Sequence, residues 1–330
     1  MPLSEFDIIA RYFQQAGLCA DVTHANIPLG IGDDCALLTV PTGYQMAVSM
    51  DVLVATVHFP LEANPALLAQ RALAVNLSDL AAMGASPIGF TLGLTLPCAE
   101  ESWLADFSQG LRLSAQKYGC PLFGGNLTRG PLQICIQVHG LVQTGKALLR
   151  SGAKPGDSVY VSGTTGRAGL ALDWIGGALT TATQEQIREL EAAYYLPEPR
   201  LKLGQALQGI ASSAQDISDG LLADLGHIAR QSDVQIVIEA DVIPLATVLL
   251  DFKSYEQALL LALTAGDDYE LIFTAPLNRH EDVISAAVSS GVNVTRIGSV
   301  SAGSGTLVLD AAGKSVQINE KGYDHFGIKP

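Results

Sequence analysis

The stretch that decides the fold covers residues 45–84 and reads QMAVSMDVLVATVHFPLEANPALLAQRALAVNLSDLAAMG. Apolar side chains alternate in its opening QMAVSM, which is the period of a half-buried strand, and Asp51 follows directly. Asn64 and Pro65 are suited to the N-cap and the first position of a helix, so we expect a helix over residues 65–84. This stretch therefore predicts a strand followed by a helix.

The same alternation continues outward and predicts two mixed α/β domains. Turn-forming residues interrupt the pattern at residues 151–157, where we place the boundary between an N-terminal domain, 1–150, and a C-terminal domain, 151–330. Further strands are expected at 88–96, 132–142, 158–162, 234–239 and 269–274, and helices at 100–118, 168–175, 185–195 and after Gly220.

Composition excludes several classes of protein. The formal net charge of −14 opposes binding to nucleic acid or to anionic lipid. No apolar run approaches the roughly 20 residues of a membrane-spanning helix. The five cysteines are dispersed without a C-x-x-C pair, and the N-terminus has an amphipathic helical pattern capped by Ser4 in place of a signal sequence. We therefore expect a cytoplasmic globular protein.

Carboxylates gather in five short strings beside glycine, serine or strand ends. Such crowded acids repel one another unless cations neutralise them, and hard divalent ions such as Mg²⁺ prefer oxygen ligands. Each string alone is readily explained as a turn or a helix start, but five together favour a metal site. The strings are Gly30–Asp34, Ser49–Asp51, Asn76–Asp79, Asp216–Gly220 and Gly266–Glu270.

Known nucleotide motifs are absent from the sequence. It contains neither a G-x-x-x-x-G-K-[ST] loop nor the H-R-D and D-F-G signatures, which excludes the P-loop and protein-kinase solutions to phosphoryl transfer. Magnesium is usually completed by substrate phosphates, so single carboxylates from separate loops suit a metal–nucleotide site on another fold.

Together these strings resemble the thiamine-monophosphate kinase family, within the superfamily of aminoimidazole ribonucleotide and selenophosphate synthetases. The resemblance runs from Phe6 to the tail Gly322-Tyr323-Asp324-His325-Phe326, and this tail and His58-Phe59 carry the substrate assignment. It implies an N-terminal domain that dimerises through its sheet, a C-terminal α/β domain that completes the site, and ATP and thiamine monophosphate as substrates.

The resemblance also assigns residues to ligands. It implies metal contacts at Asp33, Ser49, Met50, Asp51, Asp79, Asn126, Asp216 and Asp219, of which Asp51 and Asp219 carry the catalytic role. It implies ATP contacts at Tyr118, Gly125, Asn126, Arg150 and Ser218, and contacts with thiamine monophosphate at His58, Asp267 and Tyr323.

This assignment is chemically consistent with direct phosphoryl transfer. Bridging metal ions neutralise the transferring group, and an acceptor phosphate is already ionised near neutral pH, so we expect neither a strong base nor a phosphoenzyme. Gly124 and Gly125 are expected to end a strand and let backbone amides approach a phosphate, while Arg150 offers a positive fork.

Several positions depart from the family pattern and keep alternatives open. Met50 stands where relatives commonly carry Thr, so that a metal contact there requires its carbonyl oxygen. Asn126 stands where relatives have Asp or Asn, so a charge is lost in the Asp case. Leu127 replaces a common Thr or Ser, and Asp267 is one methylene shorter than the Glu often present. The alternatives are a sibling enzyme of the superfamily, a catalytically weak nucleotide-binding dimer with a regulatory role, and a purely structural dimer.

Overall fold

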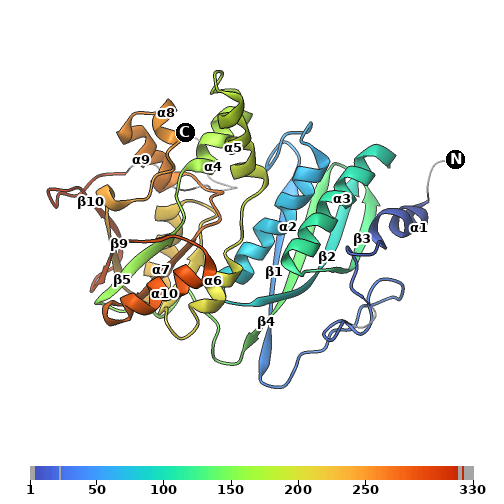
Figure 1. Ribbon diagram of the computed structural model, residues 1–330, viewed down its shortest axis with the longest axis horizontal. Helices are drawn as coiled ribbons and strands as arrows, with labels where there is room; N and C mark the ends of the chain where they lie inside the picture. The colour runs from blue at the N-terminus through green and yellow to red at the C-terminus, as the bar shows by residue number, and fades with distance from the viewer. Residues whose placement is uncertain (1–3, 22–23, 319–321, 323–330) are drawn as a thin grey trace. The chain divides into compact units, whose positions relative to one another are not determined.

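The computed structural model describes residues 4–21, 24–318 and 322, which form two compact units. The first unit runs to Leu80 and resumes over Ala85–Gly145; the second comprises Ala81–Gly84 and the chain from Lys146 onward. Each unit has a sheet of its own with helices packed on it (Figure 1). The mixed α/β architecture predicted from the sequence is thus confirmed.

The first unit contains a four-stranded sheet in the order β1-β4-β2-β3. β4 pairs antiparallel with both β1 and β2, whereas β3 runs parallel to β2, so β1 and β3 form the two edges. The strands are β1 (Tyr44–Val54), β2 (Ser86–Leu96), β3 (Leu122–Arg129) and β4 (Gln133–Gln143).

Helices α2 (Pro65–Ala82) and α3 (Glu101–Tyr118) cover one face of this sheet (Figure 1). Their apolar side chains, such as Leu73 and Phe107, are fully buried, as are Ile136 and its neighbours on the strands. Short helical turns, α1 (Glu5–Ile8) and η1 (Ile9–Phe13), precede the sheet, and Ser4 caps α1 as expected, with a reciprocal bond to Asp7.

The other face of β1 is apolar and exposed. Val48, Met50 and Val52 are 51%, 54% and 36% exposed, although side chains at these alternate positions of a strand would ordinarily be buried by a second layer. Ser49 and Asp51 take the intervening positions and therefore point to the face that carries the helices.

The second unit is built on a six-stranded sheet in the order β10-β7-β9-β5-β8-β6. All neighbouring strands pair antiparallel except β10 and β7, which are parallel. The strands are β5 (Asp157–Ser162), β6 (Ser213–Asp216), β7 (Gln235–Glu239), β8 (Leu271–Pro276), β9 (Val294–Ser301) and β10 (Gly305–Leu309).

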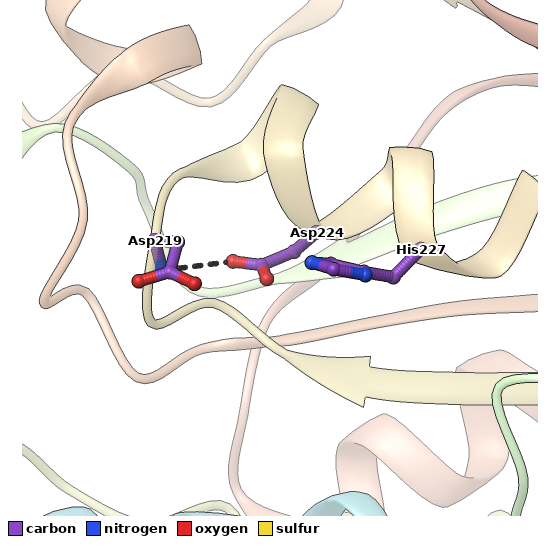
Figure 2. Close-up of side chains that lie close together, drawn as sticks. All are labelled: Asp219, Asp224 and His227. Atoms are coloured by element: carbon purple, nitrogen blue, oxygen red, sulfur yellow. Dashed lines mark hydrogen bonds between the residues drawn. The ribbon is translucent and has the colours of Figure 1, made fainter. Parts of the chain in front are cut away.

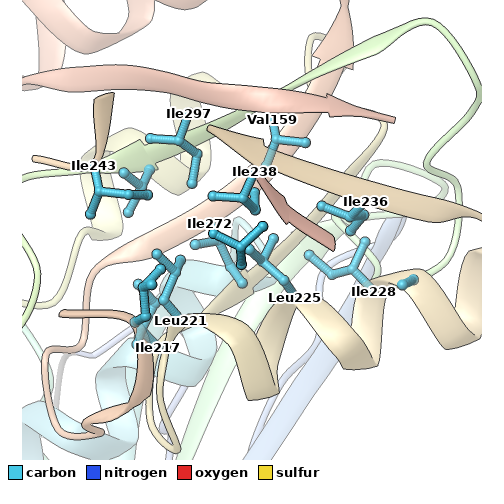
Figure 3. Packing of buried hydrophobic residues seen from close by; sticks show 14 of the residues in the cluster. Val159, Ile217, Leu221, Leu225, Ile228, Ile236, Ile238, Ile243, Ile272 and Ile297 are labelled. Carbon is cyan, nitrogen blue, oxygen red and sulfur yellow. The ribbon is translucent and has the colours of Figure 1, made fainter. Parts of the chain in front are cut away.

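Helices cover both faces of this second sheet. On one face, Leu221, Leu225 and Ile228 of α7 pack with Ile236 and Ile272 of the strands (Figure 3). On the other face, Tyr160 of β5 stacks on Phe273 and bonds His280, the first residue of α10. The helices are α4 (Arg167–Ile175), α5 (Gln184–Tyr195), α6 (Leu201–Ala206), α7 (Leu221–Ser232), α8 (Leu249–Phe252), α9 (Tyr255–Thr264) and α10 (His280–Ser290), with 3₁₀ turns η2 (Ala240–Val242) and η3 (Leu277–Arg279).

One expected strand end is wrong. Gly124 and Gly125 lie within β3 and do not end it. A Cβ atom at Gly125 would lie 2.1 Å from the carbonyl oxygen of Leu92 on the neighbouring strand, so glycine is required there for sheet packing. Within the described ranges, none of the helices has both the length and the apolar character needed to cross a bilayer.

Candidate active site

Oxygen donors of β1 and α2 meet on the helix-covered face of the first unit. The hydroxyl of Ser49 donates to Oδ2 of Asp79 at 2.6 Å. Two residues along the strand, the backbone N–H of Asp51 donates to Oδ1 of Asn76 at 2.9 Å. Asn76 is itself oriented by a bond from its Nδ2 to the carbonyl of Ala72. The structure thus brings three of the predicted metal ligands together and adds Asn76 as their support.

Secondary structure explains this meeting. Residues two apart on a strand share a face, and residues three apart on a helix also share a face, so Ser49 and Asp51 face Asn76 and Asp79. Met50 lies between Ser49 and Asp51 on the strand, and its side chain points to the opposite, exposed face of the sheet. Of the atoms of Met50, the carbonyl oxygen is therefore the one that remains a candidate metal ligand.

Two other predicted ligands of the first unit come from other segments of the chain. Asp33 is exposed in the loop before β1, where Oδ1 accepts the N–H of Asp34 at 2.9 Å. Asn126 lies on β3, opposite Gly93 of β2. Gly93 pairs with Cys135 of β4, and Cys135 pairs with Val52 of β1. Three strand spacings separate it from β1, about 14 Å along the sheet.

Tyr118 and His58 lie at the ends of elements. Tyr118 is the last residue of α3, and the ammonium of Lys117 lies 4.9 Å from the centre of its ring. His58 lies in the turn after β1, where Nδ1 accepts the N–H of Val54 at 3.0 Å. A ring nitrogen that accepts carries no proton, so Nε2 of the neutral imidazole is the donor.

In the second unit, two carboxylate strings are joined by backbone hydrogen bonds. Asp216 is buried at the end of β6, and Ser218 and Asp219 follow in the turn before α7. The N–H of Asp267 donates to the carbonyl of Ser218 at 3.0 Å. Predicted residues for metal, ATP and substrate are thereby held side by side.

Glycines allow the turns of the Asp216–Gly220 and Gly266–Glu270 strings to lie close together. A Cβ at Gly266 would lie 2.2 Å from the carbonyl oxygen of Ser218, and one at Gly220 would lie 2.5 Å from that of Thr264. Gly220 also adopts a left-handed φ of 119°, and Asp267 a φ of 70°. The glycines of both strings are thus required by close backbone contact.

The remaining acids of the Gly266–Glu270 string have structural partners. Asp268 accepts the N–H groups of Gly166 at 2.6 Å and Ala168 at 3.2 Å, at the start of α4. Burial raises the pKa of Asp268 to about 7. Glu270 is buried and binds the guanidinium of Arg200 through both oxygens, at 2.7 and 2.5 Å.

Two further polar residues, Asp224 and His227, lie beside Asp219 and were not predicted from the sequence. One ligand atom of each of the three lies within 4.8 Å of the others, and the imidazole edge faces the Asp224 carboxylate (Figure 2). Burial raises the pKa of Asp224 to about 7, with a contribution from the charge of Asp219. Burial and the charges of Arg150 and Arg230 lower the pKa of His227.

Arg150, predicted to contact ATP, is therefore close to this cluster. Its carbonyl accepts the hydroxyl of Ser232 at 3.0 Å, and the same hydroxyl accepts the N–H groups of Gly152 and Ala153 at 3.1 Å. The segment that carries Arg150 is thus anchored to the end of α7.

Comparison with known proteins identifies the family of this chain. The chain matches the AIR synthase related protein family, its N-terminal domain over residues 32–142 and its C-terminal domain over residues 154–310. It is 45% identical to the thiamine-monophosphate kinase of Escherichia coli K12, over 99% of both chains. The chain belongs to the thiamine-monophosphate kinase family.

Solved structures of this family are similar over most of the chain. The thiamine-monophosphate kinase of Stenotrophomonas maltophilia K279a has a TM-score of 0.85 and 42% identity, covering 96% of this chain and 99% of its own. AaThiL, solved in complex with AMPPCP and TMP, has a TM-score of 0.77 and 30% identity, covering 87% of this chain and 89% of its own.

The predicted substrate contact of this family member at Tyr323 falls outside the described residues. Its neighbour Gly322 is described and packs closely on the Asp219 turn, where a Cβ would lie 2.5 Å from the Asp219 carbonyl oxygen and 2.5 Å from Cβ of Ala223.

The donors of both units suit magnesium. Ser49, Asp51, Asp79, Asp216 and Asp219 offer hydroxyl and carboxylate oxygens, which hard divalent cations prefer over nitrogen or sulfur.

Proposed function

We propose that this chain transfers the γ-phosphoryl group of ATP to thiamine monophosphate, giving thiamine diphosphate and ADP. The observation that carries the proposal is the oxygen cluster of Ser49, Asp51 and Asp79 in a chain whose full-length relatives are thiamine-monophosphate kinases. The related AaThiL was solved with AMPPCP and TMP together, which supports a site for a nucleotide and a second phosphorylated ligand.

Magnesium is the proposed cofactor. Its ligands come from Asp33, Ser49, the carbonyl of Met50, Asp51, Asp79, Asn126, Asp216 and Asp219. Bound Mg²⁺ supplies positive charge against the phosphate oxygens of donor and acceptor. The chain's own task is to hold these oxygens in place: Asn76 fixes the backbone at Asp51, and Ser49 fixes the carboxylate of Asp79.

The remaining proposed contacts bind and orient the substrates. Arg150 and Ser218 serve the nucleotide, together with Tyr118 and Gly125. His58, Asp267 and Tyr323 serve thiamine monophosphate. His58 presents Nε2–H as a donor, because Nδ1 accepts from the backbone of Val54. The acceptor phosphate, with a second pKa of about 6, needs no base, and the transfer is direct.

We also propose that the protein forms a homodimer through the sheet of the first unit. The exposed face of Val48, Met50 and Val52 is apolar enough to require a cover. Asp51 and Asn126 lie on opposite edge strands of one sheet, too far apart to share an ion. A two-fold dimer that sets β1 of one copy beside β3 of the other buries this face and brings the two ligands together.

We also propose that the protein works in the cytoplasm. All five cysteines are unpaired, Cys120 being fully buried and Cys35 and Cys98 exposed, which is typical of a reducing compartment.

The test is a phosphoryl-transfer assay with purified protein, ATP, thiamine monophosphate and titrated Mg²⁺. We expect ADP and thiamine diphosphate in equal amounts and no reaction without the metal. Thiamine and the substrates of the sibling synthetases serve as controls. Nucleotide binding without conversion of thiamine monophosphate would instead support the regulatory dimer.

A further inference from the structure

Asp224, in the second turn of α7, is a carboxylate that the reaction proposed above does not use. It is 1% exposed. Its Oδ2 accepts the backbone N–H groups of Ser218 at 3.0 Å and Asp219 at 3.1 Å, and its Oδ1 accepts Nε2 of Gln215 at 2.6 Å. Figure 2 shows the bond between Asp224 and Asp219.

These bonds connect the Ser218–Asp219 turn to α7. No side chain caps α7, whose N-cap is Gly220. Asp224 instead takes up two N–H groups that precede the helix. From the other side, the carbonyl of Ser218 accepts the N–H of Asp267. The backbone that carries the Asp219 side chain is therefore bonded both to α7 and to the Asp267 turn, which leaves it little freedom.

Asp224 is poorly suited to bind a cation itself. Three hydrogen bonds already occupy its two oxygens, and all three donors would have to be given up or shared for it to become a ligand. The side chain of Asp219 is differently placed, because its backbone N–H, and not its carboxylate, bonds Asp224.

We propose that Asp224 is a positioning residue, which fixes the Ser218–Asp219 backbone so that the Asp219 carboxylate can bind the divalent cation that accompanies the nucleotide. This inference rests on the proposed function. Partners that orient a metal ligand typically change metal affinity by about 10- to 100-fold when they are removed.

The variant Asp224→Asn tests this with little change in volume. One end of an amide is a donor, so either orientation sets an NH₂ group against Gln215 or against the two N–H groups of the turn. The matched control is Asp157→Asn. Asp157 is also buried and accepts a backbone N–H, from Lys154 at 3.0 Å, but it pairs with Pro276, at the end of β8 remote from the Asp267 turn.

The readout is calorimetric binding of Mg²⁺ in the presence of AMPPCP, with no turnover required. We expect Asp224→Asn to weaken binding about tenfold and Asp157→Asn to leave it unchanged. Gln215→Met, which removes only the bond that orients Asp224, should weaken binding in the same direction by less, and it serves as the test if Asp224→Asn does not fold.

A double-mutant cycle separates positioning from general stability. If Asp224 acts through the Asp219 carboxylate, adding Asp224→Asn to Asp219→Ala should cause almost no further loss of binding. Equal losses in both backgrounds, or a loss in Asp157→Asn as large as that in Asp224→Asn, would overturn the proposal. A wild-type protein that binds Mg²⁺ and AMPPCP but does not convert thiamine monophosphate would refute the proposed function, while the cycle would still decide the role of Asp224.

Discussion

The hydroxyl of Ser49 lies 2.6 Å from Oδ2 of Asp79, so that a serine on an edge strand orients a carboxylate on the helix above it. Because this bond orients the Asp79 carboxylate, we expect Ser49→Ala to raise the Mg²⁺ concentration for half-maximal activity by about tenfold. Asp51→Ala removes a carboxylate proposed to bind the metal and should lower kcat by about 100-fold or more. Asp106→Ala, at an exposed position of α3, is the control. Near-normal turnover of Asp51→Ala at all Mg²⁺ concentrations would contradict the assignment.

A charge on the exposed face of β1 should disrupt the proposed dimer. Val48→Lys places a charge in the centre of this interface, so we expect the protein to shift from dimer to monomer, as measured by light scattering after gel filtration. Val288→Lys, at a position of α10 that is 76% exposed, should leave the mass unchanged. A monomeric wild-type protein would show that another molecule, or none, covers this face.

The positions of Asp51 and Asn126 on opposite edges predict complementation between subunits. Asp51→Ala and Asn126→Ala should each be inactive alone. When the two variants are co-expressed with different tags, random pairing of their subunits should restore about a quarter of wild-type activity. Half of the dimers are then mixed, and each mixed dimer has one intact site. Mixed dimers that are isolated and inactive would place both residues in the site of a single chain.

Sequence periodicity predicted the elements whose patterns are strong. The alternation before Asp51 predicted β1, although the strand continues to Val54, and the capped run after Asn64 predicted α2. The assignment of Ser49 and Asp79 to one metal site came from the family resemblance. The end of a strand at Gly124 was predicted wrongly, because glycine usually interrupts regular structure, whereas here it admits the backbone of Leu92.

Tertiary contacts account for what the sequence left out of the site. Asp224 has the spacing of the buried face of α7, together with Leu221 and Leu225. Its role depends on the N–H groups of a turn that only the fold brings to it. The one available signal was a charged residue on an otherwise apolar helix face.

Replacement by alanine should have opposite effects on stability at a glycine in the close contact between the two turns and at a glycine in the middle of α7. Gly266→Ala should lower the melting temperature by several degrees, because its Cβ would lie 2.2 Å from the Ser218 carbonyl oxygen. Gly226→Ala, in the middle of α7 with nothing within 4 Å of the added Cβ, should stabilise by about 0.5–1 kcal/mol. Destabilisation of both variants to the same degree would show that close approach is not the cause.

The raised pKa of Asp268 predicts a specific pH dependence of stability. The folded-state pKa of about 7 lies above the ordinary value of 3.8, so between these values the folded protein binds more protons than the unfolded chain. The free energy of unfolding of the wild type, relative to that of Asp268→Asn, should therefore fall as pH rises from about 4 to about 7, by about 1 kcal/mol per pH unit, and level off above. Urea unfolding at several pH values measures this difference, in which the titration of groups that do not interact with Asp268 cancels. A difference that rises with pH over this range would mean that the hydrogen bonds from Gly166 and Ala168 outweigh burial and hold the carboxylate ionised.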